Sequence, residues 1–186
     1  MSSEHALVPT PGQTVGPFFH YALPYDGDRD LVASGAPGAI RLTGVVTDGH
    51  GDPVPDALLE IWQPGPDGVP VQLEGSLRRD GHTFTGFGRA TTDRTGRYTF
   101  TTLRPGPLRE DRAAYVAVVV LARGLLHRLV TRCYLPGPAL ETDPFLTGVD
   151  PARRATLVAH EDEHGLVFDV RLQGLGETVF IADPAH

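Results

Sequence analysis

Apolar and polar residues alternate with a period of two in several short stretches of this chain, which is typical of half-buried β-strands. Residues 113–122 (AAYVAVVVLA) are instead almost wholly apolar and rich in β-branched side chains, which predicts a buried strand. Further strands are expected at residues 40–47, 57–62, 83–92, 97–103, 127–135, 164–173 and 178–181. The pattern therefore predicts an all-β protein with about eight strands.

Clusters of Gly, Pro and Asp separate these expected strands. The sequence DGHGDP at residues 48–53 predicts a tight turn, so the chain must reverse after its first strand. Residues 93–96 (DRTG) predict a second turn, which would join its two flanking strands into a hairpin. Asp150 before Pro151 predicts one short helix, because Asp suits the N-cap and Pro the first helical position. Frequent turns between short strands favour an antiparallel β-sandwich.

Residues 1–38 show no sustained period and are interpreted as an extended N-terminal arm of a single domain that spans residues 1–186. Aromatic residues gather between positions 18 and 25, so this arm should lie on an apolar surface of its own domain or of a partner. Trp62, the only tryptophan, is expected in the core, because large aromatic side chains dominate core packing. Glu60 lies within an expected strand and is interpreted as a solvated or structurally paired carboxylate.

The overall charge excludes some classes of partner. A net charge of −7 and a pI near 5.5 argue against nucleic acid as a partner, because it would require a basic face, and they also disfavour an anionic membrane surface. No apolar run approaches the roughly 20 residues that span a bilayer, and the first residues do not resemble a secretory signal. Cys133 is the single cysteine and is expected to be a small buried hydrophobe. Cytoplasmic residence is therefore expected.

Residues 42–70 (LTGVVTDGHGDPVPDALLEIWQPGPDGVP) resemble the signature of the intradiol ring-cleaving dioxygenases, non-haem ferric enzymes that open catechols between the two hydroxyls. Similar segments follow along nearly the whole chain: TPGQTVGPF, FGRATT, RPGP, HRLVTRCY, PARRATL and FDVRLQGLGETVF. The signature positions that match are Leu42, Gly44, Val46, Gly51, Val54, Leu59, Glu60, Ile61 and Gly68.

The resemblance also identifies where catalytic members of this family bind iron. They use two Tyr and a His-x-His pair, and tyrosinate oxygens are hard anionic donors that stabilise ferric iron. At the matching positions this chain has Pro70, Leu108, Tyr115 and Ala117. The resemblance therefore implies that the chain holds no metal and supplies no catalytic residue. It is similar to the α-type subunits of the family, which lack the ligands and pair with an iron-binding β-type subunit.

For such a subunit the resemblance implies an active site shared with the β-type partner, within a higher assembly of both chains. Fe(3+) in the partner and O2 would open protocatechuate to 3-carboxy-cis,cis-muconate. Thr14, Gly16 and Pro17 would contact the substrate. Arg132 would do so too, since a guanidinium suits the substrate's carboxylate, although a structural ion pair is the alternative role for this residue.

Other kinds of site and function were weighed against this hypothesis. His160 and His164 have helical i,i+4 spacing in HEDEH, but a zinc site needs a further ligand and dry surroundings, so none is expected there. Two other functions stay open: a β-sandwich binding or scaffolding protein without an enzyme partner, and a self-sufficient dioxygenase with altered ligands.

Overall fold

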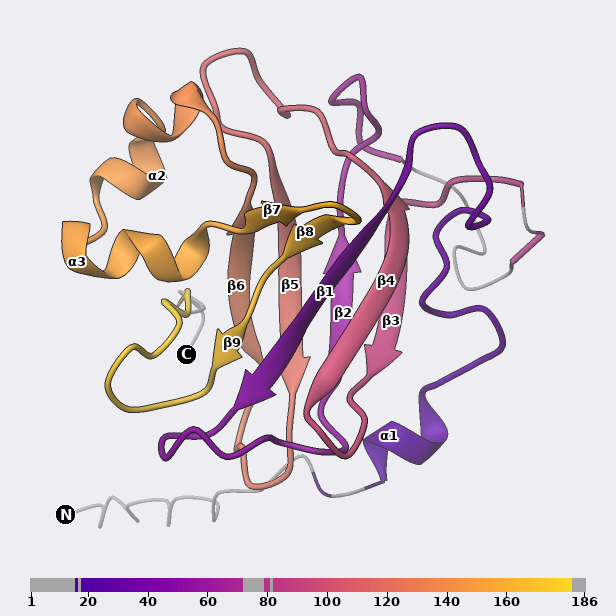
Figure 1. The fold of residues 1–186 in the computed structure, drawn as a ribbon, viewed down its shortest axis with the longest axis vertical. Helices are drawn as coiled ribbons and strands as arrows, with labels where there is room; N and C mark the ends of the chain where they lie inside the picture. The colour runs from indigo at the N-terminus through magenta and orange to yellow at the C-terminus, as the bar shows by residue number, and fades with distance from the viewer. Residues whose placement is uncertain (1–15, 17, 72–78, 81, 182–186) are drawn as a thin grey trace, which may run out of the picture.

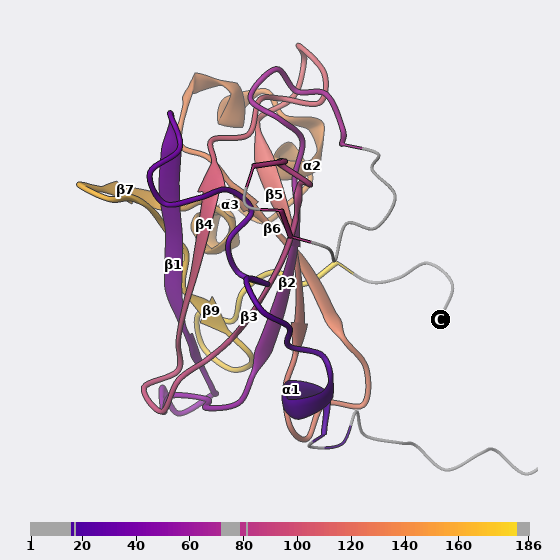
Figure 2. The same cartoon turned by 90° about the vertical axis from the view of Figure 1, so that its right-hand side faces the viewer.

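The computed structural model describes residues 16, 18–71, 79–80 and 82–181. These residues form nine strands in two sheets that pack face to face, so the expected β-sandwich is confirmed (Figure 1). Figure 2 shows the two layers side by side, with β1, β4 and β9 in one and β2, β3, β5 and β6 in the other.

The first sheet has five strands in the order β4-β1-β8-β7, with β9 also paired to β1. Its pairing is antiparallel between β1 and β4, but β8 and β9 run parallel to β1. The expected antiparallel sandwich is thus mainly antiparallel, with two short parallel pairings. The strands are β1 (Ala39–Thr47), β4 (Arg97–Leu103), β7 (His160–Asp162), β8 (Gly165–Val167) and β9 (Val170–Arg171).

The second sheet has four antiparallel strands in the order β3-β2-β5-β6. They are β2 (Leu58–Trp62), β3 (Phe87–Thr91), β5 (Tyr115–Leu121) and β6 (Leu129–Tyr134). Along β5, Val116, Val118 and Val120 are buried, while the alternate residues are only half-buried. The core therefore lies between the sheets, and the apolar run at 113–122 has one face in it. Cys133 of β6 is fully buried, as expected.

Both predicted tight turns lead from one sheet to the other. β1 and β2 belong to different sheets, and so do β3 and β4. The hairpin expected around residues 93–96 is therefore wrong, because β4 pairs with β1 and β3 pairs with β2. Turn residues reverse the chain, but the burial of apolar faces between the two layers decides which strands pair.

The helices are short and more numerous than the one helix predicted. The described residues form α1 (Phe19–Ala22), α2 (Pro144–Thr147) and α3 (Pro151–Arg154), with 3-10 helices at Pro138–Glu141 and Ala155–Leu157. Asp150 caps α3 as predicted, since its Oδ1 accepts a hydrogen bond from Ala152 N at 2.8 Å. A single helical turn is too short to produce a helical period, which explains why the others were missed. None of the helices formed by the described residues is long and apolar enough to cross a membrane.

Two more expectations about strands are corrected near the C-terminus. The run at residues 164–173 is divided between β8 and β9, and Phe168 between them donates its N–H to Thr43 O at 2.8 Å. Residues 178–181 form no strand, although Ile181 N donates to Val130 O at 2.7 Å and so lies against β6.

The described part of the N-terminal arm lies across the open edge between β3 and β4 (Figure 2). Leu31 N donates to Thr101 O of β4 at 2.8 Å, and Arg89 N of β3 donates to Asp28 O at 2.8 Å. Phe19 and Leu31 are buried, so this part of the arm packs on its own sandwich, one of the two surfaces expected for it.

Candidate functional site on the outer face of the second sheet

The outer face of the second sheet, which points away from the core, carries the residues that the sequence singled out. Trp62 of β2 is the cross-strand partner of Ala117 of β5, and Ala117 is the partner of Arg132 of β6. Tyr115 and Tyr134 are partners in the next row. Because cross-strand partners project from the same face of a sheet, these five side chains are neighbours.

Arg132 contacts two aromatic rings. Its guanidinium carbon lies 4.5 Å from the centroid of the Tyr115 ring and 4.6 Å from that of Phe145 in α2. Nη1 also donates a hydrogen bond to Tyr134 Oη at 3.0 Å. A cation that lies over an aromatic face is attracted by the ring quadrupole. We call Tyr115 and Phe145 the aromatic clamp.

The clamp is fixed by a buried carboxylate that sequence analysis missed. Asp143 is only 2% exposed, and its Oδ1 accepts hydrogen bonds from Phe145 N at 2.9 Å and from Leu146 N at 3.3 Å. Its Oδ2 accepts from Ala113 N at 3.1 Å, two residues before β5 begins. Asp143 therefore connects the helix that carries one ring to the strand that carries the other. The signal was available, because Asp143-Pro144 repeats the N-cap pattern recognised at Asp150-Pro151.

Tyr134 connects this carboxylate to the arginine. Its Oη accepts from Arg132 Nη1 and donates to Asp143 Oδ1 over a longer distance of 3.5 Å. Burial raises the pKa of Tyr134, while the hydrogen bond from Arg132 lowers it to a smaller degree. The phenol is therefore neutral near pH 7 and can act as both acceptor and donor.

A structural ion pair was the alternative role for Arg132. Within the part of the chain that the structure describes, no carboxylate lies within ion-pair distance of its guanidinium. A guanidinium carries five N–H donors, and one of them is used by Tyr134. Among the described residues, the Arg132 guanidinium therefore forms no internal salt bridge. This arrangement favours a role in which it donates to an acceptor outside this chain.

The loops that carry Pro70 and Leu108, two of the positions at which the resemblance implies an iron ligand in catalytic relatives, lie together. Gly106 N donates to Gly65 O at 2.9 Å, which joins the loop before Pro70 to the loop before Leu108. A Cβ atom on Gly68 would lie 2.1 Å from Pro107 O, so this contact between loops requires glycine. Both Pro70 and Leu108 are exposed.

The side chains at the four positions do not fit a ferric ion. Pro70, Leu108 and Ala117 carry no donor atom, and the ring of Tyr115 faces the guanidinium of Arg132. Among the described residues, no group of three or more His, Cys, Asp and Glu side chains could hold a metal ion. The donor set at these four positions therefore does not match the two Tyr and two His that would hold ferric iron.

HEDEH does not form a helix end. His160 begins β7, and His164 lies in the turn that leads to β8, so the i,i+4 spacing has no helical meaning here. Asp162 Oδ1 accepts hydrogen bonds from His164 N and Gly165 N, both at 2.8 Å, and so closes this turn. Asp162, the central acidic residue of HEDEH, thus stabilises a turn.

The prediction for Glu60 is confirmed, whereas the prediction for Trp62 is wrong. Glu60 pairs with Arg89 of β3 at 2.5 Å, which confirms its interpretation as a structurally paired carboxylate. Trp62 is 47% exposed and packs on Phe87, so the expectation of a core tryptophan is wrong. The two residues are separated by two positions in one strand, and therefore share the outer face.

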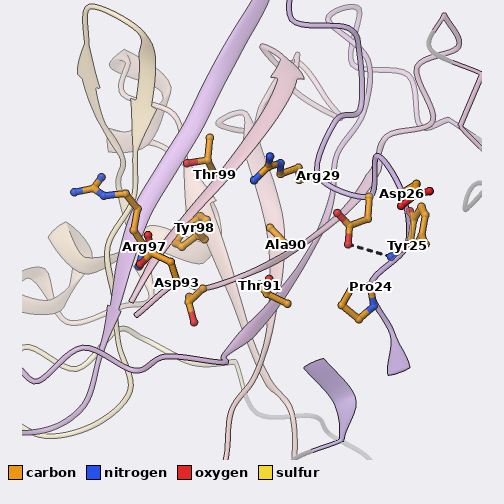
Figure 3. Close-up of a pocket in the computed structure, with 12 residues that line it drawn as sticks. Pro24, Tyr25, Asp26, Arg29, Ala90, Thr91, Asp93, Arg97, Tyr98 and Thr99 are labelled. Atoms are coloured by element: carbon orange, nitrogen blue, oxygen red, sulfur yellow. Dashed lines mark hydrogen bonds between the residues drawn. The ribbon is translucent and has the colours of Figure 1, made fainter. Parts of the chain in front are cut away.

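A polar cavity of about 470 Å³ lies at the other edge of the second sheet, where the N-terminal arm passes β3 and β4 (Figure 3). Its lining includes Tyr25, Arg29, Thr91 and Thr99. Arg132 belongs to β6, at the opposite edge of the same sheet, so this cavity is not part of the candidate site.

Only one of the three predicted N-terminal contact residues can be located. Gly16 has a φ of +76°, and a Cβ atom there would meet nothing within 4 Å. Thr14 and Pro17 lie outside the described residues. Their expected contacts with substrate stay predictions.

Comparison with known proteins places this geometry in a family. A family model described as "Dioxygenase" matches residues 15–174. The chain is 39% identical to a protocatechuate 3,4-dioxygenase alpha chain of Burkholderia cepacia, with 94% of this chain and 97% of that protein covered. It is 33% identical to the beta chain from the same organism, with 84% of this chain and 74% of that protein covered.

A solved structure supports the same placement. The dioxygenase domain of a dioxygenase–carbohydrate-binding protein fusion from Streptomyces sp. SirexAA-E matches with a TM-score of 0.57 and 27% identity. The match covers 90% of this chain and 99% of that domain. Sandwich, signature loops and sequence identity agree, and the chain belongs to the intradiol ring-cleaving dioxygenase family.

Proposed function

We propose that this chain is the iron-free α-type subunit of a protocatechuate 3,4-dioxygenase, and that it completes the substrate site of an iron-carrying β-type partner. One observation carries this proposal: Arg132 stands on the outer face in an aromatic clamp, paired with no carboxylate of the described residues. The high identity to an alpha chain and the lower identity to a beta chain support the assignment of the subunit type.

In this proposal the chain binds and orients, and the partner holds Fe(3+). When bound in the partner, Fe(3+) would supply the chemistry by which O2 opens the ring of protocatechuate to 3-carboxy-cis,cis-muconate. Protocatechuate carries a carboxylate on its ring, and the planar fork of Arg132 can donate a hydrogen bond to each carboxylate oxygen. Thr14, Gly16 and Pro17 would contact the substrate from the N-terminal segment.

The proposal extends to the state of the protein in the cell. Residues 1–186 form one domain, and this domain assembles with β-type chains into a higher α–β oligomer. Cytoplasmic residence, expected from the single cysteine, is part of the same proposal.

The first experiment compares this chain alone with the chain co-expressed with an iron-binding relative that carries Gly-x-Tyr and His-x-His. We expect the lone chain to be colourless and inactive, and the co-purified complex to contain iron and to consume oxygen with protocatechuate. Iron and ring cleavage in the lone chain would favour the self-sufficient dioxygenase. Failure of the two chains to form any complex would favour the scaffolding protein.

The second experiment tests Arg132 in that complex. Arg132→Ala should raise the KM for protocatechuate about 10- to 100-fold, because it removes a charged hydrogen-bond partner of the carboxylate. Arg128→Ala is the matched control, since this exposed arginine precedes the same strand and lies outside the clamp. An unchanged KM in Arg132→Ala would exclude the substrate role of Arg132.

A further inference from the structure

Two aromatic rings and one phenol already contact the guanidinium of Arg132. Its carbon lies 4.5 Å from the centroid of the Tyr115 ring and 4.6 Å from that of Phe145, and Tyr134 Oη accepts from Nη1 at 3.0 Å. These contacts restrict the orientation of the guanidinium and use one of its five N–H donors. The remaining donors suit a carboxylate, which can accept two parallel N–H bonds from arginine.

We propose that Tyr115 and Phe145 are positioning residues for the substrate, because they fix the guanidinium of Arg132 with its remaining N–H donors available to the carboxylate of protocatechuate. This inference rests on the proposed function, since it needs Arg132 to contact substrate. It assigns a task to Tyr115, which stands at a position where catalytic members of the family are expected to carry an iron ligand.

The need for such a clamp follows from the chemistry of arginine. A free arginine side chain has four rotatable torsions, and binding a ligand would have to order all of them. A guanidinium already held in its binding orientation avoids that loss, which improves affinity without any new contact. Ala117, the cross-strand partner of Arg132, presents only a methyl group and so leaves space for the guanidinium beside Tyr115.

The clamp has its own support, independent of any ligand. The two carboxylate oxygens of Asp143 accept hydrogen bonds from Phe145 N and Ala113 N. These bonds fix the position of α2, which carries the Phe145 ring, relative to β5, which carries the Tyr115 ring. Tyr134 lies between Asp143 and Arg132 and is fully buried. A rigid element that supports a functional side chain through buried hydrogen bonds is the arrangement expected of a preorganised site.

The test uses paired substitutions in the co-purified complex. Phe145→Leu and Tyr115→Leu remove a ring but keep an apolar side chain, whereas Phe145→Tyr and Tyr115→Phe keep the ring. We expect each leucine variant to raise the KM for protocatechuate about 5- to 10-fold with little change in kcat. The variants that keep the ring should stay within about twofold of the parent protein.

Binding without oxygen provides a second readout. Calorimetric titration should show the same loss of protocatechuate affinity in the leucine variants. Affinity for catechol, which lacks the carboxylate, should not change. The double variant Arg132→Ala/Phe145→Leu should bind protocatechuate no more weakly than Arg132→Ala alone, because residues that act through one group are not additive.

The outcomes separate the two proposals. If Arg132→Ala leaves protocatechuate binding intact, the proposed role of Arg132 fails, and the clamp fails with it. If Arg132→Ala weakens binding and the leucine variants do not, only the clamp is overturned. Equal losses for catechol and protocatechuate, or a weakened complex with the β-type chain, would also overturn it, since the rings would then serve structure.

Discussion

At the residue scale, the outer face of the second sheet combines a half-exposed tryptophan with a clamped arginine. Trp62 and Arg132 flank Ala117 in one cross-strand row. Trp and Arg are among the residues that most often carry the binding energy of protein interfaces. A large aromatic side chain that is 47% exposed therefore suits a surface that another chain covers.

The exposure of Trp62 leads to a prediction about stability. In the isolated chain, Trp62→Ala should lower the free energy of unfolding by about 1–2 kcal/mol, because much of the side chain already contacts water. Phe100→Ala is the comparison, since Phe100 is fully buried between the sheets and should cost about 3–5 kcal/mol. Urea unfolding of both variants measures the difference, and equal losses would contradict the assigned exposure of Trp62.

At the element scale, β1 is the strand that organises the first sheet. It pairs with β4 on one side and with β8 and β9 on the other. The passage from β8 to β9 is anchored by Asp169, whose Oδ1 accepts a hydrogen bond from Val45 N at 2.8 Å. Phe168 O beside it accepts from the buried hydroxyl of Tyr98. The backbone at Phe168 thus comes so close to β1 that only glycine is tolerated at position 44.

Substitution of that glycine should disrupt the sheet. A Cβ atom on Gly44 would lie 1.9 Å from Phe168 O, a backbone atom that cannot rotate away. Gly44→Ala should therefore lower the free energy of unfolding by about 3 kcal/mol or more. Gly35→Ala serves as control, because a Cβ atom there meets nothing within 4 Å. Thermal or urea unfolding compares them, and a Gly44→Ala protein as stable as its control would refute the close approach.

At the scale of the whole molecule, the sandwich encloses ionisable groups that can only be buried uncharged. Burial raises the pKa of the Cys133 thiol, and it raises the pKa of Tyr98 well above the ordinary tyrosine value. Desolvation is the largest cause for both groups, and the negative charge of Asp169 adds to it at Tyr98. The chain contains no lysine, so no amine side chain contributes to its alkaline titration.

These raised pKa values predict a loss of stability at alkaline pH. Above about pH 8.5 the unfolded chain releases protons that the folded chain retains, so the unfolded state binds fewer protons. The free energy of unfolding is therefore complete below that pH and falls as the pH rises. Urea midpoints between about pH 7 and pH 10.5 measure the slope. Cys133→Ala should make the decline shallower, and a midpoint that stays constant or rises over this range would contradict the prediction.

The sequence by itself determined the features that depend on neighbours along the chain. The period of two in β4, the apolar β-branched run that forms β5, the turns at residues 48–53 and 93–96, and the cap of α3 by Asp150 follow from local preferences. That the side chains of Pro70, Leu108 and Ala117 carry no donor atom follows from the identity of these residues alone. The predicted role of Arg132 came from the resemblance to the family. That resemblance identified the residue but did not predict which side chains surround it.

The tertiary structure alone decided what depends on packing between distant segments. It placed β1 and β2, and likewise β3 and β4, in different sheets, because strands pair where two layers can bury their apolar faces. It also placed Trp62 on the outer face of β2, the same face as Glu60. It also brought Tyr115, Arg132 and Phe145, from β5, β6 and α2, into one cluster. A side chain's partners are set by the fold in three dimensions, and no local pattern along the chain encodes them.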